Sequence, residues 1–251
     1  MDLDLTAYRA LSFDVYGTLI DWEIGIAAVL NPWASEVGLD LEDEFLLSAY
    51  ATQEAAVERE QPASLYPEVL AEAFRRTGRK LGRPVSGSWA RRLGDSVAAW
   101  PAFPDSADAL AELARHYQLI VLSNVHRDGF RASNQHLRAT LSAIITAEDV
   151  GAYKPADNHF LALERALPDL SVDRSQLLHV AQSLFHDHVP AQRHGLDSVW
   201  INRRHDRPGW GATPEPAEEF GYLAEFPSMA AFAEEVRVAF GTSGRSGGSR
   251  P

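Results

Sequence analysis

The sequence predicts an α/β fold in which a parallel sheet is flanked by helices on both faces. Near the N-terminus, the short apolar run at residues 11–13 ends in an aspartate, as a buried strand does at a ligand-binding edge. From residue 104 onward, short apolar runs alternate with stretches of helical periodicity, which is typical of β-α-β units. Between these parts, residues 21–100 show helical patterns and no convincing strand.

The first strand is expected to deliver Asp14 to the end of the sheet, followed at once by Gly17 and Thr18. Asp14 can act as a nucleophile, a base or a metal ligand, and the hydroxyl of Thr18 offers a hydrogen bond. Gly17 allows a sharp turn of the backbone. Because Asp and Gly also dominate ordinary turns, a helix-capping aspartate in a β-turn is the alternative interpretation of this segment taken alone.

Four helices are expected in the block that follows. Their apolar residues recur at three- and four-residue spacing, and segments rich in Gly and Pro separate the later ones. They are predicted at residues 22–37, 41–60, 66–78 and 89–99. We expect residues 21–100 to form a helical domain that is inserted into a core domain made of residues 1–20 and 101–240.

The second half of the chain alternates strands with helices. Strands are predicted at residues 118–122, 143–146, 177–181 and 198–202, and helices near residues 105–117, 130–139, 158–166 and 189–194. Residues 203–219 are expected to form a loop, residues 229–240 a closing helix, and residues 241–251 a flexible tail. The tail contains a formal G-x-S-x-G motif at 244–248. It lacks the strand and helix that this motif needs, so we treat it as chance.

Composition narrows the function classes. The net charge of −12 disfavours a binding surface for nucleic acid or for an anionic membrane. No apolar run approaches the ~18 residues of a membrane span, and the acidic N-terminus does not resemble a signal peptide, so we expect a cytoplasmic protein that acts on a small molecule. The absence of cysteine excludes thiolate catalysis and Cys-ligated zinc. Only two of the 23 basic residues are lysines, Lys80 and Lys154.

Chemistry-bearing residues follow several of the predicted strands and should meet at one edge of the sheet. They are Asp14 with Thr18, Ser123 with Asn124, Lys154, and Asp187. In this order the segments resemble the haloacid dehalogenase superfamily, and within it the 2-haloacid dehalogenase-like branch. The matching pieces are Phe13-Asp14-Val15-Tyr16-Gly17-Thr18-Leu19, Leu122-Ser123-Asn124, Tyr153-Lys154-Pro155 and the segment around Asp187. The resemblance implies a Rossmann-like core and identifies the helical insert as the family's α-helical cap.

The resemblance also implies a hydrolase mechanism. Asp14 would attack a small 2-haloalkanoic acid and release halide, and water would hydrolyse the resulting ester to a 2-hydroxy acid. Lys154 would keep Asp14 ionised, because a cation within ~4–6 Å lowers the pKa of a carboxylate by ~1–3 units. Asp187 would pair with Lys154 and polarise the water. A solvated surface lysine is the alternative interpretation of Lys154. The groups that would position nucleophile or substrate are Thr18, Ser123 and Asn124.

Tyr16 separates two candidate reactions. Phosphatases of the superfamily carry a second aspartate at this position, which serves as the acid and base for the leaving group. A tyrosine with a pKa of ~10 is a poor substitute, whereas a halide leaves without a proton. Carbon–halogen cleavage without a cofactor is therefore favoured. The alternative is a Mg²⁺-dependent phosphatase acting on a small phosphate ester, in which Asp14, the Tyr16 carbonyl and Asp187 would be the metal ligands.

Several substrate-side residues depart from the dehalogenase pattern. Known dehalogenases place an arginine in the first cap helices, but residues 45–51 contain none and the nearest is Arg59. Phe160 stands where the family often has a tyrosine. Only Ser183 and Asp187 match the family's usual run before the last aspartate. A 2-haloacid substrate is thus less secure than the ester mechanism.

The remaining expectations concern histidines and assembly. His186 is expected to face the site and to donate to substrate or water. A transition-metal site built from His179, His186, His188 and His194 is disfavoured because the ligand spacing of such sites is missing. The expected substrate-binding set is therefore Tyr16, Thr18, Ser123, Asn124, Ser183 and His186. A homodimer is expected by analogy only.

Overall fold

The computed structural model describes residues 3–243 and contains a fully parallel sheet of six strands in the order β3-β2-β1-β4-β5-β6. The strands are β1 (Ala10–Phe13), β2 (Gln118–Ser123), β3 (Ala143–Thr146), β4 (Leu177–Ala181), β5 (Asp197–Ile201) and β6 (Ala224–Phe226). The α/β prediction and all five predicted strands are confirmed. β6 was not predicted, because three residues are too few to show a periodic pattern.

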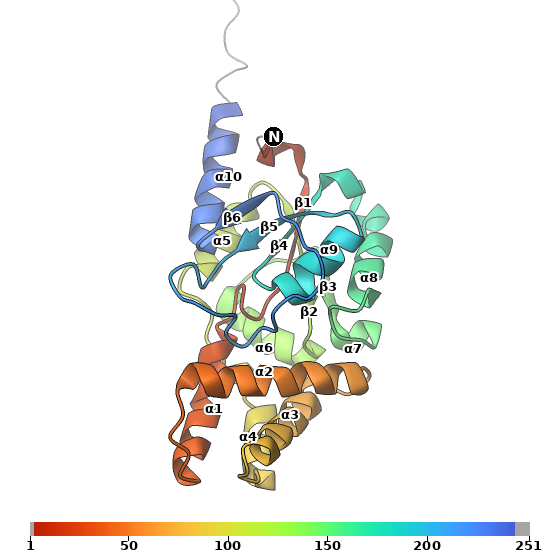
Figure 1. Cartoon of the computed structure of the whole chain (residues 1–251). Helices are drawn as coiled ribbons and strands as arrows, with labels where there is room; N and C mark the ends of the chain where they lie inside the picture. The colour runs from red at the N-terminus through yellow and green to blue at the C-terminus, as the bar shows by residue number, and fades with distance from the viewer. Residues whose placement is uncertain (1–2, 244–251) are drawn as a thin grey trace, which may run out of the picture.

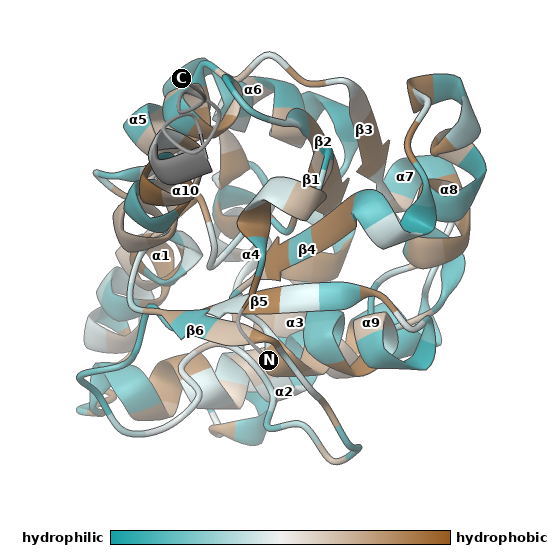
Figure 2. Ribbon diagram, turned by 90° about the horizontal axis from the view of Figure 1, so that it is seen from above, coloured by the Kyte–Doolittle hydropathy of each residue, from teal (hydrophilic) through white to brown (hydrophobic). Residues whose placement is uncertain are grey.

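Successive residues of the central strands face opposite sides of the sheet, and each side has its own apolar core. Leu11 and Phe13 of β1 belong to the core that includes Phe232, whereas Ala10 belongs to a second core with Phe160. Figure 2 shows α5, α6 and α10 on one side of the strands and α7, α8 and α9 on the other. A layer of helices on both faces explains why these strands are almost entirely buried and mostly apolar.

The four expected helices of the insert are present. They are α1 (Trp22–Glu36), α2 (Asp43–Glu60), α3 (Tyr66–Lys80) and α4 (Gly87–Gly94). We call α1–α4 the helical insert; in Figure 1 it lies below the sheet, with α2 next to the core. The predicted fourth helix was too long, since α4 ends at Gly94 and a separate 3₁₀ turn, η2 (Val97–Ala99), follows. One apolar cluster runs from β1 into α1 and α3, and the division into two domains stays a prediction.

The remaining helices are α5 (Ser106–Leu113), α6 (Arg127–Leu137), α7 (Ala147–Val150), α8 (Asn158–Ala166), α9 (Val189–Arg193) and α10 (Met229–Ser243). Short turns are η1 (Leu5–Ala7), η3 (Pro168–Leu170), η4 (Arg174–Gln176) and the π-helical η5 (Leu184–His188). α10 includes residues 241–243, so the predicted tail began three residues too early. Its remainder, with the G-x-S-x-G motif, lies outside the described residues. Within residues 3–243, no helix is long and apolar enough to cross a membrane.

Candidate active site

The chain turns sharply where β1 ends, and this turn positions Asp14. The Asp14 amide donates to the Val180 carbonyl at 3.1 Å, which continues the pairing with β4 by one residue. Gly17 has a φ of +93°, and a Cβ there would lie 2.9 Å from a Gln182 side-chain oxygen. The turn brings the Thr18 hydroxyl to 2.7 Å from Asp14 Oδ2, to which it donates. Asp14 therefore has one carboxylate oxygen fixed by its own turn.

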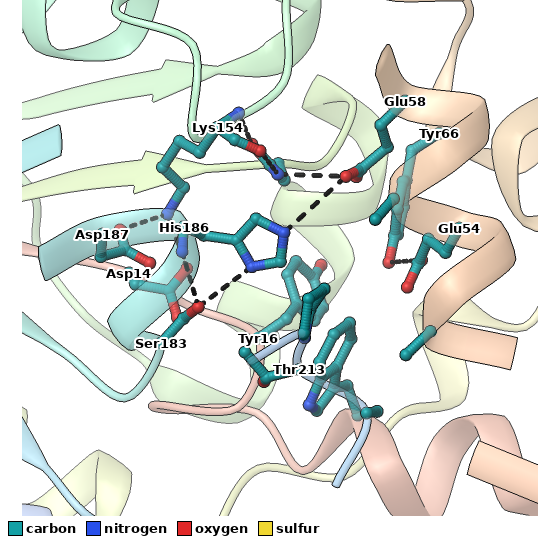
Figure 3. A pocket seen from close by; sticks show the side chains of 16 residues that line it. Asp14, Tyr16, Glu54, Glu58, Tyr66, Lys154, Ser183, His186, Asp187 and Thr213 are labelled. Atoms are coloured by element: carbon teal, nitrogen blue, oxygen red, sulfur yellow. Dashed lines mark hydrogen bonds and ion pairs between the residues drawn. The ribbon is translucent and has the colours of Figure 1, made fainter. Parts of the chain in front are cut away.

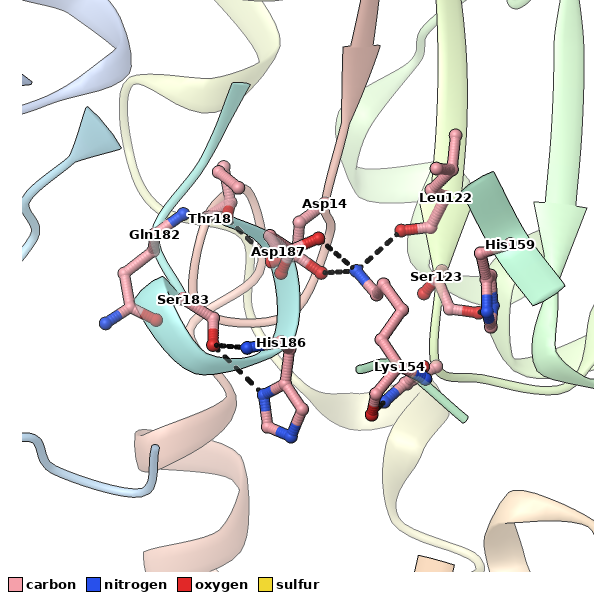
Figure 4. A network of polar contacts seen from close by, with 12 residues as sticks. Asp14, Thr18, Leu122, Ser123, Lys154, His159, Gln182, Ser183, His186 and Asp187 are labelled. Carbon is pink, nitrogen blue, oxygen red and sulfur yellow. Dashed lines mark hydrogen bonds and ion pairs between the residues drawn. The ribbon is translucent and has the colours of Figure 1, made fainter. Parts of the chain in front are cut away.

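Lys154 occupies the centre of the polar network in Figure 4. Its ammonium donates to Asp14 Oδ1 at 2.8 Å, to Asp187 Oδ1 at 2.7 Å and to the Leu122 carbonyl at 3.0 Å. The Asn124 side chain accepts from the Lys154 amide at 2.7 Å and donates to its carbonyl at 3.1 Å, which holds the lysine backbone. Lys154 is fully buried, with all three ammonium protons used. It is not a solvated surface lysine.

Burial and charge act differently on the two carboxylates. Burial raises the pKa of Asp14, and the negative charge of Asp187 raises it further. Lys154 and Thr18 lower this pKa but do not cancel the increase. Lys154 therefore favours the ionised form of Asp14, as predicted, but burial outweighs this effect and leaves the pKa of Asp14 raised. Burial also opposes ionisation of Asp187, but Lys154 and His179 outweigh it and hold the pKa of Asp187 well below its usual range. Asp14 is thus the more basic of the two carboxylates.

The segment after β4 is a π-helical turn, a form that often marks functional sites. Ser183 caps it by accepting from the His186 amide at 2.9 Å, and the Ser183 hydroxyl lies 3.0 Å from His186 Nδ1. Burial lowers the pKa of His186 to about 4, so its ring is neutral at pH 7. Asp187 Oδ1 lies 3.1 Å from His179 Nε2, whereas Asp187 Oδ2 is buried without a hydrogen-bond partner.

These groups form part of the wall of a cavity between the sheet and the helical insert, seen in Figure 3. Its free volume is about 30 Å³, enough for about two water molecules. Residues 212–214 of the loop after β5 close another side. This free volume is smaller than an organic substrate, so binding one requires the lining residues to shift.

Seven of the nine predicted site residues line the cavity: Asp14, Tyr16, Asn124, Lys154, Ser183, His186 and Asp187. Thr18 and Ser123 do not. Thr18 contacts the site only through its hydrogen bond to Asp14. The buried Ser123 hydroxyl has no hydrogen-bond partner. Tyr16 presents its ring to the cavity, but its hydroxyl hydrogen-bonds with the Ser133 hydroxyl at 2.9 Å on α6.

With this geometry established, comparison with known proteins assigns the family. The family model for haloacid dehalogenase-like hydrolases matches residues 8–181. The chain belongs to this family. A search of curated protein sequences finds no match.

Several solved structures share the fold. The L-2-haloacid dehalogenase RSc1362 is 23% identical with a TM-score of 0.75, covering 92% of this chain and 99% of its own. An L-2-haloacid dehalogenase from Xanthobacter autotrophicus, with chloropropionic acid covalently bound, is 19% identical with a TM-score of 0.72 (92% and 98% covered). The HAD-hydrolase YfnB from Bacillus subtilis, bound to magnesium, is 18% identical with a TM-score of 0.71 (92% and 99% covered).

Two carboxyl groups of this haloacid dehalogenase-like hydrolase were missed at the sequence level. Glu54 and Glu58 of α2 line the cavity and are buried. The signal was present in the sequence, because both continue the four-residue spacing of Leu46 and Tyr50 along the buried face of α2. The apolar residues of that face predict packing alone, and the dehalogenase pattern predicts an arginine there, not a carboxyl group.

Neither glutamate has a cationic partner in close contact within the described structure. Tyr66 and Tyr50 donate to Glu54 Oε1 at 2.9 and 3.4 Å. Glu58 has only long contacts: the Asn124 side-chain amide lies 3.5 Å from Glu58 Oε1, and His186 Nε2 lies 3.9 Å from Glu58 Oε2. Burial raises the pKa of Glu54 to about 7 and the pKa of Glu58 well above its usual range.

Arg59 and Phe160 do not substitute for the missing family residues. Arg59 is exposed and does not line the active-site cavity; it lines two neighbouring cavities, one of which also contacts Glu58 and Lys154. Phe160 is fully buried in the second core, where it stacks on His194, and it does not reach the active-site cavity. The substrate-side chemistry of this hydrolase therefore differs from the dehalogenase pattern.

A magnesium ion, as the alternative reaction requires, fits these residues poorly. Lys154 already hydrogen-bonds one oxygen of each proposed carboxylate ligand, Asp14 and Asp187, and Thr18 occupies the other Asp14 oxygen. Across residues 3–243, no three His, Asp or Glu side chains group so that they could hold a metal ion. Of the carboxylate oxygens expected to bind the ion, only Asp187 Oδ2 is without a hydrogen-bond partner.

Proposed function

We propose that this haloacid dehalogenase-like hydrolase cleaves a carbon–halogen bond through an ester formed on Asp14. The observation that carries the proposal is the pair of hydrogen bonds that fixes that carboxylate: Lys154 donates to one oxygen and Thr18 to the other, at the wall of a small cavity. Two fixed donors orient a nucleophile and reduce the freedom it must lose in the transition state. The raised pKa of Asp14 adds to its nucleophilicity.

The reaction has two steps. An Asp14 oxygen attacks the halogen-bearing carbon; a carbon–oxygen bond forms, the carbon–halogen bond breaks, and halide leaves with the electron pair. Water then attacks the Asp14 carboxyl carbon and the ester bond breaks; one water proton passes to the product oxygen, the other is released to solvent, and the Asp14 carboxylate is restored. The partner-free Oδ2 of Asp187 lies in the cavity wall, where it can accept a hydrogen bond from this water.

The position of Tyr16 favours a leaving group that needs no proton. Burial raises the pKa of Tyr16 further, and its hydroxyl is already engaged with Ser133. An acid for the leaving oxygen of a phosphate ester is thus missing where phosphatases of the family carry it. The covalent complex with chloropropionic acid in the Xanthobacter dehalogenase supports an ester route on the same fold. This proposal covers the carbon–halogen bond and leaves the rest of the substrate open.

The test is isotope incorporation into Asp14. A single turnover with excess enzyme in H₂¹⁸O, using a panel of short chlorinated alkanoic acids, alcohols and amines with EDTA present, should place ¹⁸O in the peptide that contains Asp14. Chloride should appear in equal amount, and Asp14→Asn should abolish both signals. Chloride release without label in Asp14 would contradict the ester mechanism.

A parallel assay with Mg²⁺ and small phosphate esters tests the alternative. Phosphate release that requires the metal, with no chloride release from any member of the panel, would replace this proposal with the phosphatase.

A further inference from the structure

The cavity wall is dominated by carboxyl groups. Four carboxyl side chains line it, two from the core and two from α2, whereas Lys154 is the single Lys or Arg among its lining residues, all of which the structure describes. The ammonium of Lys154 is saturated by Asp14, Asp187 and the Leu122 carbonyl. No cation is therefore left for Glu54 and Glu58, or for the carboxylate of a substrate.

We propose that Glu54 and Glu58 form a recognition site for a positively charged group, so that the substrate is a short haloalkyl ammonium compound and not a 2-haloalkanoic acid. The inference rests on the proposed function and names its substrate class. Asp14 attacks the halogen-bearing carbon at the core side of the cavity, while the ammonium end of the substrate lies against α2.

Hydrogen bonding within the cavity supports a missing cationic donor. Glu58 is buried to more than nine-tenths, yet its nearest donors stand at 3.5 and 3.9 Å, which is long for a charge-assisted bond. Asp187 Oδ2, fully buried in the same wall, has no donor. Buried carboxylate oxygens are ordinarily satisfied, and an ammonium group brings up to three donors in one small volume.

The electrostatics of the cavity also favour an ammonium group over a carboxylate. A carboxylate substrate would find no unsaturated cation in this cavity, and its charge would oppose the ionisation of Glu54 and Glu58, since like charges in a low-dielectric site repel strongly. The raised pKa values of Glu54 and Glu58 are those of buried acids without a counter-ion. A bound ammonium would lower both and so gain binding energy from their ionisation.

The experiment measures binding apart from catalysis, so that it stands even if the leaving group is not halide. Calorimetric titration of the full-length protein at pH 8 compares propylammonium with propionate, two unreactive ions of similar size. We expect propylammonium to bind at least about tenfold more tightly. Glu54→Gln/Glu58→Gln should remove this preference, while Asp40→Asn, which removes an exposed carboxylate just before α2, should leave it intact.

Three results would overturn the inference. They are tighter binding of propionate, equal or undetectable binding of the two ions, and a preference for propylammonium that survives in the double variant. Thermal unfolding of each variant confirms that it is folded before titration. Chloride release from 3-chloropropylammonium and 3-chloropropionate, measured separately with Asp14→Asn as control, reports on the carbon–halogen proposal. If neither compound releases chloride but the protein still prefers propylammonium, the proposed charge selectivity is supported and only the carbon–halogen proposal is rejected.

Discussion

At the scale of single residues, Lys154 links Asp14, the proposed nucleophile, to the fold. It is the one buried lysine of two in the chain, and it sits between two carboxylates that could not both be ionised side by side without it. Breaking a buried ion pair by removing one partner is far more costly than its net contribution suggests, because the remaining charge is left unpaired. Stability and reactivity therefore depend on the same ammonium group.

Lys154→Met should destabilise the protein by about 3–5 kcal/mol, because Asp14 and Asp187 lose their shared cation. Urea unfolding at pH 7 measures this loss. The matched control is Lys80→Met, an exposed lysine at the end of α3, which should change stability by no more than about 0.5 kcal/mol. Equal effects of the two substitutions would contradict the central role of the buried ammonium.

The same variant should shift the pH dependence of ester formation. Asp14 must be ionised to attack, and its pKa is already raised by burial. Without Lys154 the pKa rises further, so the acid limb of the rate profile should move to higher pH. The rate at neutral pH should fall by about 10²–10³-fold. Single-turnover rates between pH 5 and 9 measure both effects, and a reduced rate with an unshifted profile would assign Lys154 a structural role only.

At the scale of secondary-structure elements, α2 combines apolar packing with buried carboxyl groups. Its buried face begins with leucine and tyrosine and ends in Glu54 and Glu58, so one helix packs the insert and also supplies polar groups to the cavity. A four-residue spacing predicts which side chains share a face, but it does not reveal whether that face meets apolar packing or a polar site. Here both occur along a single helix.

Glu54 should make the stability of the protein depend on pH. Its pKa rises from 4.5 to about 7 on folding, so the native state holds a proton that the unfolded state releases between these values. The contribution of Glu54 to stability is therefore fully present below pH 4.5 and is lost as the pH rises through 7. Relative to Glu54→Gln, which does not titrate, the wild type should lose roughly 1–3 kcal/mol between pH 5 and pH 8.

Urea unfolding of both proteins at a series of pH values tests this expectation. Asp40→Asn, an exposed change on the same side of the molecule, should keep a nearly constant offset from the wild type. A constant offset for Glu54→Gln as well would show that the carboxyl is not protonated in the folded state.

Sequence analysis at the element level succeeded where a pattern is local. The five strands found were each defined by their own apolar run, and Asp14 and Lys154 were found because each follows a motif within a few residues. The features that the sequence did not predict depend on very short segments or on residues far apart in the sequence. β6 is too short to carry a pattern, and the importance of Glu54 and Glu58 depends on Lys154, which lies about a hundred residues away in the sequence.

At the scale of the whole molecule, one arginine ties the core loop to the helical insert. Arg204, in the loop after β5, pairs with Glu23 of α1 at 2.9 Å and with Glu44 of α2 at 2.7 Å. The same glutamates accept the amides of Ala212 and Gly211 at 2.8 and 3.2 Å. Because residues 212–214 also line the cavity, this network fixes one side of the cavity wall against the helical insert.

Arg204→Gln should loosen this side of the cavity wall. Loss of the two ion pairs should cost about 1–3 kcal/mol, and amide hydrogen exchange should accelerate in residues 209–214 and in the first turns of α2. Arg207→Gln is the control, since this exposed arginine pairs only weakly with its neighbour Asp206 and should change stability by about 0.5 kcal/mol or less. Faster exchange spread evenly over the sheet would indicate general destabilisation and not local loosening of the cavity wall.

The sequence by itself determined the α/β class, the order of strands and helices, and the meeting of Asp14 and Lys154 at one edge of the sheet. Short-range periodicity encodes the elements, and the parallel sheet brings the residues at the strand ends together at one edge. Only the tertiary structure decided that the insert presents carboxyl groups to the site, that Lys154 has no free donor, and that Asp14 is more basic than an ordinary aspartate. Those properties arise from desolvation and from contacts between segments remote in the sequence, and no local pattern encodes them.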